Sequence, residues 1–142
     1  MRLRRTTERG SASLEAVFAV GFLLIPVAAL LAQAPGWVDT SHTAQSAANE
    51  AARAAVLTDD IAAAGSIAEA TAAAVVANHG HDATDLLAVN LDGTFSRGAT
   101  LTVTVQLQGH QIVVPGLGTI GPAYTATGSA TERVDDYRGF GP

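Results

Sequence analysis

The chain contains no cysteine and no lysine, and few of its side chains are aromatic or charged. Without cysteine, neither disulfides nor thiolate metal sites can stabilise the fold. Aromatic residues make up only 5% of the 142 residues, and alanine inflates the apolar fraction of 48%, so a core in water would be thin. This composition favours a fold that gains stability by docking onto a membrane helix or a neighbour. The net charge of −5 argues against nucleic acid as a partner.

One long apolar run stands out near the N-terminus, over residues 14–34, and Glu15 is its only charged residue. As a helix these 21 residues would span about 31 Å, close to the ~30 Å hydrocarbon core of a bilayer. Pro26 interrupts the middle of the run, Gln33 lies at its far end, and Trp37 suits the outer interface. The sequence therefore predicts a transmembrane helix over residues 11–35.

Charge predicts the orientation of this helix. Residues 1–10 carry four arginines against one glutamate, a net charge of +3, whereas residues 11–142 carry a net charge of −8. The positive-inside bias places a basic leader, residues 1–10, in the cytoplasm and residues 36–142 outside the cell membrane. We therefore expect a single-pass membrane protein with an extracytoplasmic domain.

The external domain begins with two predicted alanine-rich helices, at about residues 39–57 and 59–78. Small residues of the first helix recur on one face, at Ala44, Ala48, Ala51 and Ala55, where they would permit close packing. The alternative is a solvated helix of high propensity. Thr58 or Asp59 would cap the second helix, and Gly80 would follow its end. Pro35-Gly36 would either break or only bend the chain between the membrane helix and the first of these helices.

The pattern changes to strands at about residues 86–134. Apolar residues alternate over 87–91 before an expected turn at Asp92-Gly93, and most clearly over 100–108. A short run at 112–114 precedes an expected loop over 116–122, and residues 124–134 form a last strand. The predicted class is therefore α+β, a pilin-like fold in which helices cover one face of a small antiparallel sheet.

Catalysis has little support in the sequence, and we expect no enzyme, cofactor, metal or small-molecule substrate. One cluster has the residue types of a zinc site: His79, His81, Asp82 and Asp85. It follows a predicted helix end, where such residues commonly serve in capping and solvation. Ser41 and His42 are adjacent, but no third partner for a hydrolase triad can be argued.

The junction R-G-S-A-S-L-E, residues 9–15, carries the strongest functional signal. A carboxylate within hydrocarbon costs about 2.5–3.5 kcal/mol, less near the surface, so Glu15 is unusual there. If a peptidase cut after Gly10, Ser11 would expose a new ammonium, and Glu15 would lie one helical turn away on the same face. That carboxylate could pair with the amine of its own chain or of a neighbour and set subunit register. A hydrated glutamate at the membrane edge is the alternative.

The glycine before this cut and a glutamate at mature position five resemble the type IV prepilin signature. With A-A-N-E-A-A-R-A-A at residues 47–55 after the membrane helix, the chain resembles TadE-like minor pseudopilins of the Tad machinery, which assembles Flp pili. Ala16 stands where that family often has an aromatic residue. The resemblance implies processing by a prepilin peptidase between Gly10 and Ser11, and assembly with other pilins, pseudopilins and Tad membrane components.

A secretory signal peptide is the alternative interpretation, with Ala32-Gln33-Ala34 as its cleavage site. The apolar run exceeds the usual length of about 7–15 residues, Glu15 would interrupt it, and Pro35 would become the first mature residue. Under this alternative the chain would be a secreted or membrane-tethered binding domain with no pilus role.

Overall fold

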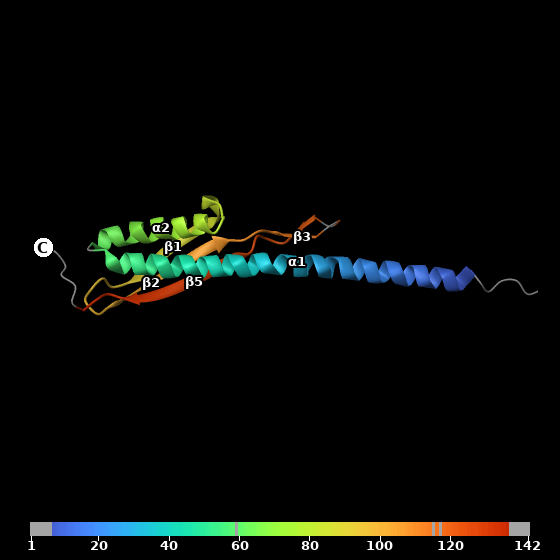
Figure 1. Ribbon diagram of the computed structural model, residues 1–142, viewed down its shortest axis with the longest axis horizontal. Helices are drawn as coiled ribbons and strands as arrows, with labels where there is room; N and C mark the ends of the chain where they lie inside the picture. The colour runs from blue at the N-terminus through green and yellow to red at the C-terminus, as the bar shows by residue number, and fades with distance from the viewer. Residues whose placement is uncertain (1–6, 59, 115, 117, 137–142) are drawn as a thin grey trace, which may run out of the picture. The chain divides into compact units, whose positions relative to one another are not determined.

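The computed structural model describes residues 7–58, 60–114, 116 and 118–136, and for residues 7–12 and Ile61 it describes the backbone alone. Two α-helices, α1 (Thr7–Leu57) and α2 (Ile61–Asn78), are followed by a short 3-10 helix, η1 (Ala83–Asp85). The strands of this part of the chain are β1 (Leu86–Gly93), β2 (Thr100–Gln108), β3 (Ile112–Val114), β4 (Gly118–Ile120) and β5 (Thr125–Arg133) (Figure 1). The predicted α+β class is confirmed.

The apolar segment and the first alanine-rich helix form one uninterrupted helix, α1. Pro35-Gly36 does not break it, although the proline removes a backbone donor. Just beyond, two hydroxyl groups bond back to carbonyls one turn earlier: Thr40 Oγ1 donates to Gly36 O at 2.8 Å, and Ser41 Oγ to Trp37 O at 2.9 Å. Helix α1 includes a stretch, Ser13–Leu57, that is long and apolar enough to cross a membrane.

Contacts divide the chain into two compact units. One comprises Met1–Ala34 and Gln111–Pro122, and the other comprises Pro35–His110 and Ala123–Pro142. The segment of residues 111–122 therefore groups with the apolar part of α1, whereas the sequence pattern predicts it as part of the external domain. We call these the apolar unit and the α+β unit.

The α+β unit has two layers. Its antiparallel sheet has the order β1-β2-β5, and the central strand buries Leu101, Val103, Val105 and Leu107 while the threonines and glutamines between them line the other face. Helix α2 lies beside the C-terminal part of α1 (Figure 1), and alanines of both helices share one core cluster with β2. The alternation of β2 thus determines which face the helices cover.

Helix α2 begins later than predicted. Its N-cap is Asp60, whose Oδ1 accepts a hydrogen bond from the Ala62 backbone N–H at 2.9 Å, so Thr58 does not cap it. Asp59 itself lies outside the described residues. Gly80 follows the helix with a φ of +81°, which confirms the predicted glycine at this end.

Two predicted connections are wrong. Asp92-Gly93 is not a turn, because both residues pair with β2, Asp92 with Thr102 and Gly93 with Leu101. The chain reverses between Gly93 and Thr100 instead. The expected loop over residues 116–122 contains β4, which pairs with β3 to form a hairpin. Residues of β4 are small or β-branched and compatible with a strand, but glycines at 116, 118 and 121 obscured this pattern in the sequence.

Candidate functional site

The apolar unit exposes a long row of large apolar side chains on α1. More than half of the surface of Leu14, Val17, Phe18, Phe22 and Leu23 is exposed, and no side chain from residue 13 to residue 34 is buried. Soluble monomers rarely present so large a continuous apolar surface, which marks contact with a membrane or with another protein.

Glu15 is exposed at the start of this surface. It borders a shallow, open hollow on α1 whose other lining residues are apolar: Val17, Phe18, Ala19, Gly21, Phe22 and Ile25. Within the part of the chain that the structure describes, no hydrogen bond or ion pair reaches the Glu15 carboxylate. An unpaired carboxylate on an apolar helix face is available to an external cation.

Gly10 and Ser11, the predicted processing residues, lie in the first turns of α1 by their backbone. Their side chains lie outside what the structure describes. Glu15 follows Ser11 by four helical residues, so the two positions share a helix face.

The predicted small face of α1 lies in the core of the α+β unit. Ala44, Ala48, Ala51 and Ala55 are each completely buried, within a cluster that includes α2 and β2. A Cβ atom added at Gly128 of β5 would overlap the Ala44 backbone. The main chains of helix and strand therefore approach one another closely at this point, as small residues permit.

A glutamine joins the apolar segment of α1 to the hairpin of the same unit. Gln33 Nε2 donates to Val113 O at 3.1 Å and to Ala29 O at 3.0 Å, while Val113 N donates to Gln33 Oε1 at 2.9 Å. Both amide protons and the amide oxygen are thus used. The sequence signal for this contact was a polar residue inside an apolar run, but its partner lies 80 residues away.

A second glutamine makes the same kind of contact in the α+β unit. Gln45 Nε2 donates to Ser129 O at 2.8 Å, and Ser129 N donates to Gln45 Oε1 at 3.4 Å. Strand β5 is at the edge of its sheet, so Gln45 satisfies backbone groups that would otherwise lack a strand partner. Sequence reasoning missed both contacts, because a surface glutamine gives no sign of the strand it reaches.

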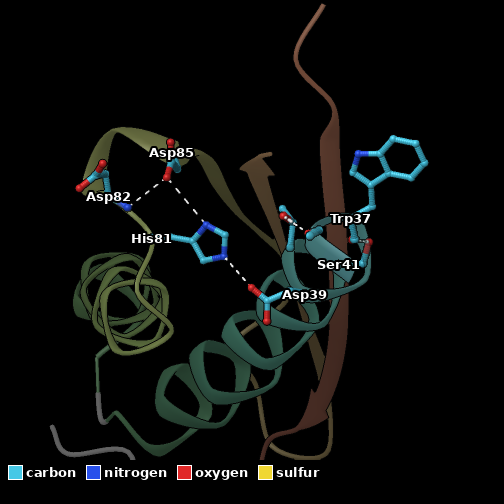
Figure 2. Close-up of polar contacts among 8 residues, drawn as sticks. Trp37, Asp39, Ser41, His81, Asp82 and Asp85 are labelled. Atoms are coloured by element: carbon cyan, nitrogen blue, oxygen red, sulfur yellow. Dashed lines mark hydrogen bonds and ion pairs between the residues drawn. The ribbon is translucent and has the colours of Figure 1, made fainter. Parts of the chain in front are cut away.

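His81 lies between two carboxylates, as Figure 2 shows. Its Nε2 is 3.5 Å from Asp39 Oδ2 of α1, and its Nδ1 is 3.8 Å from Asp85 Oδ2, which also accepts a 3.0 Å hydrogen bond from Asp82 N. Only 6% of the His81 side chain is exposed, whereas 61% of the Asp39 side chain is. The cluster links the segment after α2 to α1.

This arrangement does not form a metal centre. The two ring nitrogens of His81 face different carboxylates, so one ion could not contact all three groups. Among the described residues, no group of three or more histidine or acidic side chains has an arrangement that could hold a metal. Of the four candidates from the sequence, the side chains of His81 and Asp85 come together, and Asp82 takes part only through its backbone N–H. Asp39 is the partner that the sequence could not indicate.

Ser41 does not form a hydrolase dyad with His42. Its Oγ lies 2.9 Å from the Tyr124 hydroxyl and donates to Trp37 O, and His42 is exposed. The polar contacts of this region therefore join α1 to the segment that enters β5.

No known protein family, no curated protein and no solved structure matches this chain.

Proposed function

We propose that this chain is a TadE-like minor pseudopilin, a single-pass structural component of Tad/Flp pilus assembly or of an allied secretion apparatus. The observation that carries the proposal is Glu15, an unpaired carboxylate on an exposed apolar helix surface, four residues after Ser11. The R-G-S-A-S-L-E junction and the A-A-N-E-A-A-R-A-A stretch support it from the sequence.

The role of Glu15 follows from electrostatics. Cleavage after Gly10 would place the Ser11 ammonium at the membrane boundary, one turn from the carboxylate. A charge in a medium of low dielectric constant is costly alone and much less costly when paired. An unpaired Glu15 would therefore select a subunit whose amine lies at the matching depth, and this pairing would align neighbouring membrane helices.

Continuity of α1 supports the same proposal over the signal-peptide alternative. A signal peptidase cut after Ala34 would fall inside a helix that continues to Leu57, and it would remove Gln33, which holds the β3–β4 hairpin. A cut after Gly10 would leave all of these contacts in place. The basic residues 1–10 would remain cytoplasmic and the α+β unit would lie outside.

The mature N-terminus tests the proposal. The chain is expressed in a host that carries a prepilin peptidase, extracted from the membrane, and measured intact by mass spectrometry. We expect Ser11 as the first residue, and we expect Gly10→Leu to leave the leader attached. Glu50→Ala, which alters an exposed carboxylate far along α1, is the matched control and should be processed normally. A soluble protein that begins at Pro35 would overturn the proposal and favour a secreted binding domain.

A further inference from the structure

The β3–β4 hairpin has the composition of a membrane-contacting segment. No residue from 111 to 131 carries a charge. Val114 is buried, but Val113 is 56% exposed and Ile120 is 48% exposed, so the hairpin presents β-branched side chains outward. Val113 pairs with Thr119 and Ile120 pairs with Ile112, so these two side chains lie on opposite faces of the uncharged hairpin, and the described residues leave both largely exposed.

The hairpin is attached to the apolar segment itself. Gln33, its partner on α1, lies within the run of residues 14–34. Pro26, Ala29 and Gln33 are half-buried and share one helix face, whereas Leu23, Leu24 and Leu31 are exposed. Strand β3 lies beside α1 (Figure 1), in the same compact unit as the apolar part of that helix. Pro26 lies eight residues, or about 12 Å along the helix axis, before Ala34, the last residue of the apolar run.

Backbone hydrogen bonding at the edge of β3 that faces α1 suits this surrounding. A strand edge in hydrocarbon is unfavourable, because no water satisfies its amide groups. The Val113 N–H and C=O, which face away from β4, both bond to Gln33, and the remaining amide proton of Gln33 bonds to Ala29 O. Gln33 thereby removes two unsatisfied backbone groups from the edge of β3 and leaves no unsatisfied proton of its own.

We propose that the β3–β4 hairpin is a second membrane contact, which lies in the outer leaflet beside α1 with Val113 and Ile120 against lipid acyl chains. The inference rests on the proposed single-pass topology. We assign lipid as the partner of these side chains because the α1 segment that carries Gln33 is itself long and apolar enough to lie in the bilayer. Any element bonded to that segment shares its depth.

Depth-dependent fluorescence quenching tests the hairpin directly. The full chain is reconstituted in phosphatidylcholine vesicles whose acyl chains are brominated, in a Trp37→Phe background that removes the single tryptophan. Ile120→Trp and, as a second reporter, Val113→Trp report on the hairpin. Phe18→Trp reports on the apolar segment, and Arg53→Trp, at an exposed charged position, reports on water. We expect both hairpin reporters to be blue-shifted and quenched nearly as strongly as Phe18→Trp, and several times more than Arg53→Trp.

The glutamine contact provides the matched comparison. Gln33→Leu should reduce the quenching at position 120 toward the level of Arg53→Trp, because the edge of β3 loses its partner, and should leave Phe18→Trp unchanged. Gln45→Leu removes the equivalent pair of bonds in the α+β unit and should change neither reporter.

The outcomes separate this inference from the proposed function. If Phe18→Trp is quenched but both hairpin reporters resemble Arg53→Trp, the hairpin inference is overturned and the membrane helix stands. If Phe18→Trp is also unquenched, the single-pass topology fails, and the hairpin inference fails with it. If both hairpin reporters are shielded from water only at a high ratio of protein to lipid, the hairpin contacts a second copy of the chain. That result would overturn the lipid contact.

Discussion

Gly128 of β5 lies directly against the main chain of α1 at Ala44, with no space for a side chain between them. The backbone of Gly128 is not in the left-handed region, so proximity and not conformation requires glycine at this position. Ala44 is itself fully buried. This contact therefore determines how closely the helix can approach the sheet in the α+β unit.

Gly128→Ala should destabilise the α+β unit, because the new methyl group would displace either β5 or α1. We expect a loss of about 1–3 kcal/mol in the free energy of unfolding. The measurement is chemical unfolding of the full chain in detergent micelles. Gly65→Ala is the matched control, since a Cβ atom there meets nothing within 4 Å and α2 should gain about 0.5–1 kcal/mol. Equal stability of the two variants would contradict the close approach.

Ala51→Leu should also be destabilising, for a related reason. Ala51 is completely buried, and leucine adds roughly three carbons to a packed contact at a cost of about 1–3 kcal/mol. Ala70→Leu on α2, where the alanine is exposed, should be nearly neutral because leucine is a good helix former. Thermal unfolding of both variants compares them. An unchanged melting temperature for Ala51→Leu would indicate that this helix face can separate from the core freely.

The two carboxylates beside His81, those of Asp85 and Asp39, should contribute unequally to the free energy of unfolding. The Asp85 side chain accepts a hydrogen bond from Asp82 N and is only 30% exposed. Asp85→Ala should therefore lower the free energy of unfolding by about 1 kcal/mol. Asp39 is largely exposed, and its ion-pair partner is His81, so Asp39→Ala should lower the free energy of unfolding by less than about 0.5 kcal/mol. Urea unfolding of the two variants under one buffer condition measures the difference. A larger loss for Asp39→Ala would mean that the link to α1 dominates this cluster.

Glu15→Ala should separate assembly from processing. Loss of the carboxylate should ease membrane insertion and leave cleavage after Gly10 intact, yet impair pilus assembly because a neighbour's ammonium loses its partner. Processed protein and surface pili are quantified in the same strain, with Glu50→Ala as the control on the same helix. Normal piliation of the Glu15→Ala strain would identify Glu15 as a hydrated residue at the membrane edge.

The sequence predicted the elements whose pattern is local. Alternation over 100–108 matched β2 at both ends, and the i, i+3, i+4 alanines of α1 matched its buried face. The connections between strands were harder to predict. Asp92-Gly93 has the composition of a turn, but both residues pair with β2 as part of strand β1. Pairing with β2 outweighed the local preference of these two residues.

The candidate site shows the same difference between features that are local in the sequence and contacts between distant residues. Glu15 and the junction around Gly10 can be read from adjacent residues, since charge in an apolar run is a local signal. The pairs Gln33–Val113, Gln45–Ser129 and Asp39–His81 join residues far apart in the chain, and their side chains are of types common on any surface. Only the fold brings them together, so no spacing in the sequence could have indicated them.

The alanine-rich core also has a thermal consequence. Ten of the fourteen buried residues in the main core cluster of the described chain are alanine, and each buries only a methyl group. The heat capacity change of unfolding scales with the apolar area that unfolding exposes. That change should therefore be smaller than is usual for a domain of this length, and the free energy of unfolding should vary only gently between cold and warm conditions.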